Sequence, residues 1–262
     1  MATYLDRILE EHRATTAADT RALDDVLAEA RAGDPPRGFA AALRAASATE
    51  LAVIAEVKRR SPSKGDLAPA LDPAVTAGAY AAGGAACLSV LTDGQWFGGS
   101  AADLQAARSA VSIPVLRKDF TVGPLDVADA RGMGADAVLL IVAALSDAEL
   151  SDLHAMALDL GLDVLVEVHD EDELGRAVAV GATLIGVNQR DLVTFEVDTD
   201  RAVRVGAAMP DGVVRVAESG IRGADDAARL ADAGFHAVLV GESVVTAGDP
   251  AASVTALRVP RR

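Results

Sequence analysis

Length, composition and charge exclude several classes of protein at the outset. The chain has 262 residues, 51% of them hydrophobic and only 3% aromatic, with a formal net charge of −15. A core of small aliphatic residues favours buried parallel strands covered by helices over an all-β sandwich. A strongly negative field argues against nucleic acid and anionic membranes as partners.

The first 47 residues are expected to form one or two helices ahead of the first strand. Leu5, Ile8 and Leu9 give the start an apolar face, and the run from Gly33 to Pro36 breaks the helical pattern. This extension could close the bottom of a barrel or lean over its mouth, and the pattern allows both placements.

Short apolar runs bounded by turn residues predict eight strands. Helix-like stretches separate them, with N-cap signals such as Asp72-Pro73 and the capping box Ser146-Asp-Ala-Glu149. Strict alternation of strand and helix indicates a parallel sheet, and eight repeats allow it to close. We expect one domain over residues 1–262, a (β/α)8 TIM barrel at 48–262 with an N-terminal helical extension at 1–47. The predicted strands are 51–58, 86–91, 115–119, 137–142, 163–168, 183–188, 213–219 and 237–241.

A glycine precedes every second predicted strand. Gly84, Gly134, Gly181 and Gly234 are spaced by 50, 47 and 53 residues. The spacing is typical of four stacked quarters of a barrel, although glycines commonly end helices in any α/β protein.

The chain offers no candidate for a membrane span or a disulfide. The longest apolar run, Ala137 to Leu145, is far shorter than the ~20 residues that a spanning helix needs, and residues 1–10 lack the apolar segment of a signal peptide. Cys87 is the single cysteine, in a strand-like setting. We therefore expect a cytoplasmic protein, as a monomer or a weak homo-oligomer.

Lysine is rare in this chain and gathers at one predicted site. Of 24 basic residues only Lys58, Lys64 and Lys118 are lysines. A position that keeps lysine can require a compact ammonium whose pKa moves, which arginine does not provide. For Lys58 and Lys118, partial burial beside another cation is expected to lower the pKa.

Polar side chains end several predicted strands, where barrel active sites lie. Side chains alternate between the two faces of a strand, which places Glu56 and Lys58 on one face. The same alternation predicts that Lys118, Glu167 and Asn188 lie at the ends of other strands. The first pair alone could be a structural ion pair. Buried polar groups on several strands at matching depth would cost too much desolvation to serve packing only, so we predict an active site.

Two further features indicate a ligand. The last two strands end in the small-residue turns Ser219-Gly220 and Gly241-Glu242-Ser243, where this fold commonly holds phosphate, although each turn singly could be only a tight turn. The loop after the second strand carries Trp96 and Phe97, which predicts either a flat apolar ligand or a simple lid.

Cofactor and metal signals are weak. Gly132-Met-Gly134 has the outline of a dinucleotide loop, but it follows a helix and precedes a strand, the reverse of the order that places pyrophosphate at a helix N-terminus. The four histidines lack metal-ligand spacing. We therefore predict no cofactor and no metal.

Seven segments in chain order resemble the motifs of indole-3-glycerol phosphate synthases. IAEVKRRSPSKG and LRKDF are distinctive, whereas AESGI and GES recur in other phosphosugar barrels. The opening YLDRILEEHR at 4–13 is also similar to that family's extension. The segments are 54–65, 91–93 with 97–100, 116–120, 165–169, 186–192, 217–221 and 241–243.

The resemblance implies an enzyme of tryptophan synthesis that acts on a small phosphorylated substrate. That substrate is 1-(2-carboxyphenylamino)-1-deoxyribulose 5-phosphate, which loses carbon dioxide and water to give indole-3-glycerol phosphate. By this resemblance Lys118 is the general acid at the ketone oxygen and Glu167 the base in dehydration. Glu56 and Lys58 complete the proton-transfer set, with Lys58 near the substrate carboxylate. Asn188 is implied as a further catalytic residue and, with Arg190, orients the ring portion. The implied binding residues are Phe97 and Phe120 for the aryl pocket, Ser61, Ser219, Gly220, Gly241, Glu242 and Ser243 for the phosphate, and Glu218 elsewhere on the substrate.

The same residues are compatible with three other functions. A phosphoribosylanthranilate isomerase-like enzyme shares the barrel and the phosphate loops, but the segments at 54–65 and 116–120 argue against it. A phosphosugar-binding barrel without turnover and a Schiff-base aldolase using Lys118 are the remaining alternatives.

Overall fold

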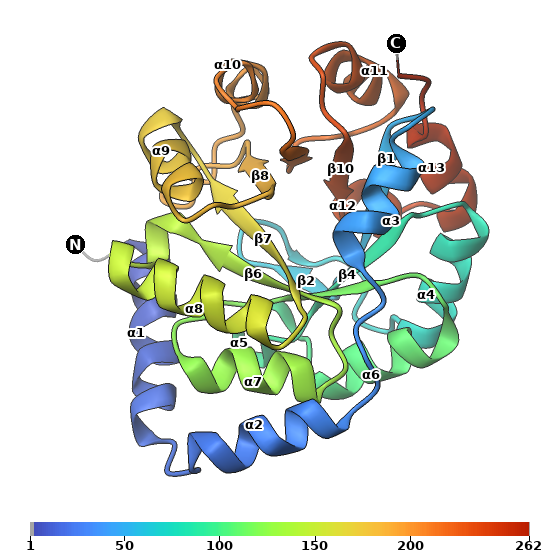
Figure 1. The fold of residues 1–262 in the computed structure, drawn as a ribbon. Coiled ribbons are helices and arrows are strands. Elements are labelled where there is room, and N and C mark those ends of the chain that lie inside the picture. The colour runs from blue at the N-terminus through green and yellow to red at the C-terminus, as the bar shows by residue number, and fades with distance from the viewer. Residues whose placement is uncertain (1–2, 262) are drawn as a thin grey trace.

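The computed structural model describes residues 3–261, and its centre is a closed barrel of eight parallel strands (Figure 1). Around the barrel the strand order is β1-β10-β9-β8-β7-β6-β5-β4, so neighbours in the chain are neighbours in the sheet. The predicted fold class is confirmed. The barrel strands are β1 (Ala52–Val57), β4 (Cys87–Leu91), β5 (Val115–Lys118), β6 (Ala137–Ile141), β7 (Asp163–Val168), β8 (Leu184–Asn188), β9 (Val214–Glu218) and β10 (Ala237–Val240).

Helices cover the outside of the barrel between successive strands, as Figure 1 shows. The predicted caps are present: the Asp72 side chain accepts from Ala74 and Val75 N–H at the start of α4, and Ser146 with Glu149 forms the capping box of α8. A small antiparallel pair, β2 (Arg60–Ser61) and β3 (Gly65–Asp66), follows β1. The helices after β1 are α4 (Pro73–Ala82), α5 (Gly94–Phe97), α6 (Ala101–Ala110), α7 (Pro124–Gly132), η1 (Val142–Ala144), α8 (Asp147–Asp159), α9 (Glu171–Ala179), α10 (Arg201–Ala207), α11 (Ala224–Asp232), α12 (Glu242–Val245) and α13 (Pro250–Leu257).

The four spaced glycines share one conformation. Gly84, Gly134, Gly181 and Gly234 have φ between +77° and +89°, the left-handed region that ends helices at low steric cost. Each therefore turns the chain from a helix into the next inner strand. Gly134 lies in the turn from helix α7 to strand β6. A dinucleotide site requires the opposite order, a strand followed by a helix.

The N-terminal extension forms three helices rather than the expected one or two: α1 (Tyr4–Ala18), α2 (Leu23–Ala32) and α3 (Phe39–Ala46). Residues 1 and 2 of the predicted extension lie outside the described residues. Thr3 caps α1 through Asp6 N–H, and the break near Gly33 separates α2 from α3. Gly38, with φ +76°, starts α3 in a left-handed turn that the sequence pattern did not reveal.

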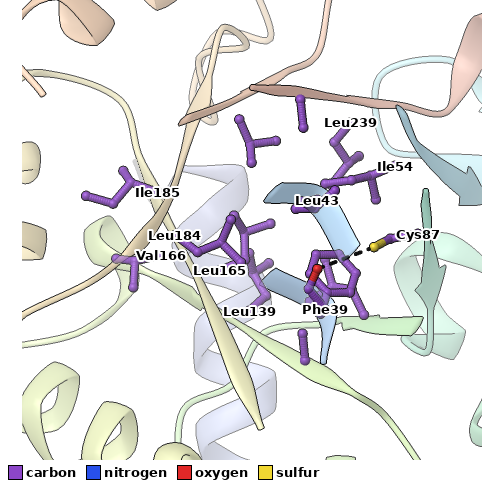
Figure 2. Packing of buried hydrophobic residues seen from close by; sticks show 14 of the residues in the cluster. Phe39, Leu43, Ile54, Cys87, Leu139, Leu165, Val166, Leu184, Ile185 and Leu239 are labelled. Atoms are coloured by element: carbon purple, nitrogen blue, oxygen red, sulfur yellow. Dashed lines mark hydrogen bonds between the residues drawn. The ribbon is translucent and has the colours of Figure 1, made fainter. Parts of the chain in front are cut away.

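The extension serves both ends of the barrel. At the bottom, the Ala40 N–H of α3 donates to Asp163 at the start of β7, and the Cys87 thiol lies 3.6 Å from the Phe39 carbonyl oxygen (Figure 2). At the top, Tyr4, Leu5 and Ile8 of α1 line the cavity at the mouth. The two placements that the sequence left open are therefore both present, on different helices.

Large aliphatic side chains fill the barrel below the mouth (Figure 2). Ile54, Leu116, Leu139, Leu165 and Leu239 are each at most 5% exposed. Strand register then sets the next layer, because Glu56 pairs with Ser89, Glu167 with Gly186 and Asn188 with Glu218. An apolar floor thus supports a polar layer. Among residues 3–261 no helix is long and apolar enough to cross a bilayer.

Candidate active site

A cavity of about 560 Å³ opens at the carboxyl ends of the strands. Every residue predicted for the site from the sequence lies on its wall. These are Glu56, Lys58, Ser61, Phe97, Lys118, Phe120, Glu167, Asn188, Arg190, Glu218, Ser219, Gly220, Gly241, Glu242 and Ser243. Lys64 also lines the cavity, so all three lysines of the chain meet there.

Lys118 stands at the centre of the polar layer. Its Nζ lies 3.1 Å from Glu167 Oε2 and 3.9 Å from Glu218 Oε2. The other oxygen of Glu167 accepts a hydrogen bond of 3.0 Å from the Asn188 amide. The three strands β5, β7 and β8 thus hold an ammonium and a carboxylate in fixed contact, with the lysine side chain only 16% exposed.

The charge state of Lys118 differs from the sequence-based expectation. Burial lowers the pKa of Lys118, but the charges of Glu167, Glu218 and Glu56 outweigh burial and raise it above its ordinary value. The expected lowering is wrong because the groups nearest to the ammonium are carboxyl groups rather than a second cation. In the free protein Lys118 is therefore a firmly protonated donor.

Glu167 and Glu218 have opposite pKa shifts. For Glu167, burial raises the pKa, but the nearby charges of Lys118 and His169 and the Asn188 hydrogen bond bring it below its ordinary value. For Glu218, burial and the charge of Glu167 raise the pKa well above its ordinary value. Two carboxyl groups whose surroundings separate their pKa values can supply one base and one acid.

Glu56 and Lys58 form a second pair at the end of β1. Lys58 Nζ lies 2.5 Å from Glu56 Oε1, and the side chains are 15% and 6% exposed. Ser89 lies 3.4 Å from the other carboxylate oxygen. Gly241 faces this pair, and a Cβ added there would overlap Glu56 Oε1, so a larger residue would displace the pair.

Two small-residue turns form another wall of the cavity. Ser219 and Gly220 have φ of +66° and +73°, which turns the chain sharply after β9. The Ser243 hydroxyl donates 2.9 Å to the Ile221 carbonyl and so ties the turn after β10 to the turn after β9. Lys64, 3.6 Å from Glu242, is 52% exposed at the rim. The predicted phosphate residues are thus brought together beside a cation.

The opposite wall is apolar. The Phe97 and Phe120 ring centroids are 6.4 Å apart, and Leu5 and Ile8 of α1 add apolar lining to the cavity. Trp96 is absent from the residues that line the cavity; its indole N–H donates to Glu11 on α1. Of the two aromatic residues singled out in this loop, one faces the cavity and the other contacts the N-terminal helix.

Sequence reasoning missed several residues of the site. Apolar spacing in the N-terminal segment indicated a helix face but not that Tyr4, Leu5 and Ile8 would line the mouth. Gly186 was also missed: a Cβ there would overlap Glu218 Oε1, so this glycine makes room for the acid. Its only signal was its place in the segment 186–192.

The histidine spacing also hid a contact. His12, Asp93 and Asp119 place side-chain atoms within 4.8 Å of one another, although 107 residues separate the first and the last. In the structure the ring nitrogen of His12 already lies 3.0 Å from Asp93.

Fold and site together define a barrel enzyme that performs acid–base chemistry on a small molecule, because paired lysine and glutamate groups face an enclosed cavity with one apolar and one polar wall. The profile of the indole-3-glycerol phosphate synthase family matches residues 5–257. The chain belongs to this family, whose members are carboxy-lyases of tryptophan biosynthesis, and the resemblance found in the sequence motifs is confirmed.

Individual relatives agree with the family match. The chain is 55% identical to an indole-3-glycerol phosphate synthase from Nocardioides sp., over 94% of this chain and 92% of the relative. It is 52% identical to the enzyme of that name from Mycolicibacterium vanbaalenii and 51% identical to the one from Mycobacterium ulcerans, each over 98% of this chain and 94% of the relative.

A solved structure supports the fold alone. Thiamine phosphate pyrophosphorylase from Pyrococcus furiosus superimposes with a TM-score of 0.59 at 16% sequence identity, over 79% of this chain and 93% of that chain.

Proposed function

We propose that this chain closes the indole ring of 1-(2-carboxyphenylamino)-1-deoxyribulose 5-phosphate, releasing carbon dioxide and water to give indole-3-glycerol phosphate. The observation that carries the proposal is the contact of 3.1 Å between Lys118 and Glu167 in a cavity that also holds the small-residue turns and the two phenyl rings. Family membership supports the reaction, and the geometry supports the assignment of roles.

Lys118 is the proposed acid of ring closure. The ring carbon that carries the carboxylate attacks the ketone carbon, and the ketone oxygen takes a proton as the new bond forms. Loss of carbon dioxide then restores the aromatic ring. A protonated amine fixed between carboxyl groups is suited to donate that proton, and contact with the substrate carboxylate and phosphate is expected to change the balance of charge that holds the proton on Lys118.

Glu167 is the proposed base of the dehydration. The hydroxyl at the former ketone carbon leaves as water with a proton from an acid, and a proton leaves the carbon next to nitrogen to form the double bond. Glu167 is held as a carboxylate by Lys118 and Asn188. Glu218, whose pKa is raised, lies where a neutral carboxylic acid can donate a hydrogen bond to the substrate.

The remaining groups bind and orient the substrate in this proposal. Lys58, paired with Glu56, meets the substrate carboxylate, and the pair completes the proton-transfer set. Asn188 orients Glu167 and the ring portion of the substrate. Arg190, which donates a hydrogen bond of 3.0 Å to the Phe195 carbonyl, lies beside the same portion of the substrate.

The phosphate is proposed to bind at the wall made by the turns after β9 and β10, and the aryl ring between Phe97 and Phe120. Cations line the cavity as a whole, among them Lys58, Lys64, Lys118 and Arg190. They offset a chain charge of −15, since charges beyond about 8 Å are screened at physiological salt. The proton transfers need no cofactor or metal, and none is proposed. The phosphate-wall residues are Ser61, Ser219, Gly220, Gly241, Glu242 and Ser243.

We also propose a single domain in the cytoplasm, as a monomer or weak homo-oligomer. The described residues share one continuous core from Ile8 to Leu257, and the only cysteine, Cys87, is buried. Light scattering over a concentration series tests the oligomeric state.

The decisive test of function mixes purified protein with the carboxyphenylamino substrate. We expect indole-3-glycerol phosphate, detected by its indole-type fluorescence, and carbon dioxide to form in equal amounts. Isomerisation without loss of carbon dioxide would favour the isomerase alternative, and binding without turnover would favour a non-catalytic barrel. Borohydride trapping of Lys118 with substrate would favour a Schiff-base mechanism.

A further inference from the structure

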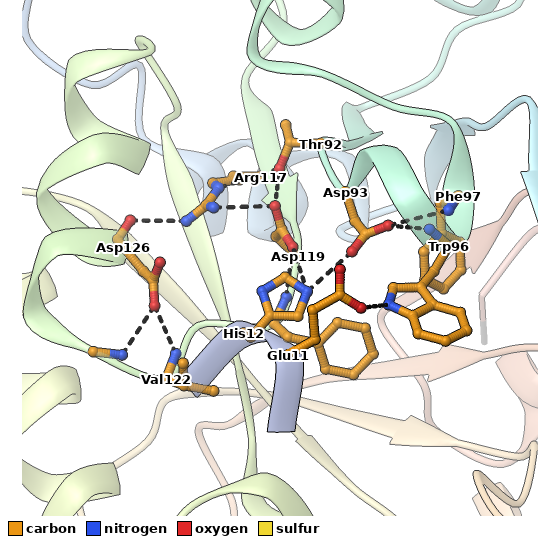
Figure 3. A network of polar contacts seen from close by, with 12 residues as sticks. Glu11, His12, Thr92, Asp93, Trp96, Phe97, Arg117, Asp119, Val122 and Asp126 are labelled. Atoms are coloured by element: carbon orange, nitrogen blue, oxygen red, sulfur yellow. Dashed lines mark hydrogen bonds and ion pairs between the residues drawn. The ribbon is translucent and has the colours of Figure 1, made fainter. Parts of the chain in front are cut away.

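The N-terminal helix α1 contacts the short helix α5 and its N-cap residue Asp93; Figure 3 shows the contacts of Glu11 and His12. Tyr4 packs edge-on against Trp96 with ring centroids 5.0 Å apart. Glu11 accepts a hydrogen bond of 3.0 Å from the Trp96 indole, and His12 lies 3.0 Å from Asp93. These contacts matter for the site because α5 ends in Phe97, which lines the cavity.

Asp93 connects the two helices. Its Oδ1 accepts the backbone N–H groups of Trp96 and Phe97, at 2.6 and 3.2 Å, and so caps α5. Its Oδ2 accepts from the His12 ring nitrogen. Asp93 is 7% exposed, so water competes little for either oxygen. The orientation of this one carboxylate is therefore fixed jointly by α1 and by the backbone that carries Phe97.

His12 also reaches the second phenyl ring. The centroid of its ring lies 5.4 Å from that of Phe120, and its Nε2 lies 3.9 Å from Asp119 Oδ1. Asp119 Oδ1 in turn accepts the backbone N–H of Phe120 at 2.9 Å. Arg117 holds the other oxygen of Asp119 at 3.0 Å. His12 thus contacts Phe120 directly and Phe97 through Asp93.

We propose that His12 is a positioning residue that sets the distance and tilt of the Phe97 and Phe120 rings, and thereby the affinity for the aryl part of the substrate. The inference rests on the proposed aryl pocket. It assigns the N-terminal helix a second role beyond covering the mouth: its imidazole joins the loops after β4 and β5, each of which supplies one wall of the pocket.

The surroundings of His12 make this contact sensitive to pH. The charged groups that face it are Asp93 before α5, Asp119 after β5 and Asp126 on α7, with Arg117 of β5 behind Asp119. Burial lowers the pKa of His12, but the Asp93 hydrogen bond and the charges of Asp119, Asp93 and Asp126 outweigh it, so the pKa is raised. As pH rises through this pKa, the charge-assisted bond weakens, and KM is expected to rise.

Two substitutions separate the hydrogen bond from the charge. His12→Leu removes both, and we expect KM to rise about five- to tenfold while kcat changes less than about twofold. His12→Gln keeps an N–H donor near the position of Nε2 without the charge. It is expected to keep KM within about threefold of the wild type and to remove the rise of KM with pH.

Arg13→Gln is the matched control, because Arg13 is the next residue of α1 and fixes that helix to α8 through Glu149, away from the phenyl rings. If Arg13→Gln raises KM as much as His12→Leu does, the effect comes from docking of α1 in general, and the proposal is wrong. A KM in His12→Leu that stays at the wild-type value would overturn it as well.

Trp96, the only tryptophan, reports on the same contact without substrate. We expect its emission to change with pH in the wild type and in Arg13→Gln but not in His12→Gln. Wild-type protein that fails to convert the substrate would refute the proposed function, whereas an emission change that persists in His12→Gln would refute the role of His12 independently.

Discussion

The Asn188 amide donates a hydrogen bond of 3.0 Å to one oxygen of Glu167, while the other oxygen lies 3.1 Å from Lys118 Nζ. This arrangement fixes both the orientation and the charge of the carboxylate. Glu167 differs in this respect from Glu218, whose Oε1 lacks a hydrogen-bond partner within the described residues. The pKa values of the two acids are therefore shifted in opposite directions although both acids line one mouth.

Glu167→Gln is expected to leave the fold intact and to reduce kcat by about 100-fold or more, because it removes the proton acceptor at nearly constant volume and general acid–base groups supply about 10²- to 10⁴-fold. Steady-state kinetics with a thermal melt measures both quantities. Glu171→Gln on α9, whose side chain is 49% exposed, is the control for the same chemical change. Retention of kcat within about threefold in Glu167→Gln would end the assignment of a base.

Gly220→Val is expected to raise KM far more than it lowers kcat, because it alters the wall proposed to bind phosphate. Gly220 has φ +73°, and a Cβ would come 2.5 Å from Val197 Cγ1, so some loss of stability is also expected. Gly212→Val provides the control, since Gly212 has φ +84° with open space around it in the turn before β9. Equal KM values for the two variants would mean that the phosphate binds elsewhere.

The strands were predictable from the sequence because short apolar runs and the turn residues that bound them are local signals. Each observed barrel strand begins and ends within one residue of its predicted bounds, as in 51–58 against Ala52–Val57. Closure of the barrel then forces the carboxyl ends together, so residues as distant as Glu56 and Ser243 could be assigned to one mouth.

Features set by packing between distant segments were not predictable in this way. The contact of His12 with Asp93 depends on how α1 crosses the mouth, which no periodicity encodes. The pKa of Lys118 was predicted to move in the wrong direction, because strand faces reveal which residues share a mouth but not that the charges of Glu167, Glu218 and Glu56 outweigh burial there.

Lys118 is expected to resist acylation near neutral pH in the free protein, since its raised pKa leaves little free amine. Lys64, 52% exposed at the rim, is expected to react first. Peptide mapping over a time course gives the order. Glu167→Gln should speed the reaction of Lys118, because it removes the charge that contributes most to raising the pKa. Reaction of Lys118 ahead of Lys64 in the wild type would contradict the charge assignment.

Glu218→Gln is expected to make the protein more stable relative to the wild type as pH rises from 5 to 8. The folded-state pKa of Glu218 is raised by burial and by the charge of Glu167, whereas in the unfolded chain a glutamate ionises near its ordinary pKa of about 4.3. Above that value the folded wild type binds more protons than the unfolded chain, so the contribution of this group to stability is complete at low pH. It falls by up to about 1.4 kcal/mol per pH unit until the folded pKa is reached. Glutamine has nearly the same shape as the neutral acid but does not titrate, so the Glu218→Gln variant does not lose this stability as pH rises.

Urea unfolding at pH 5 and pH 8 measures the difference, with Glu171→Gln as the control for an exposed glutamate. If the stability difference between Glu218→Gln and the wild type is the same at both pH values, Glu218 is ionised in the folded protein and cannot be the neutral acid of this site.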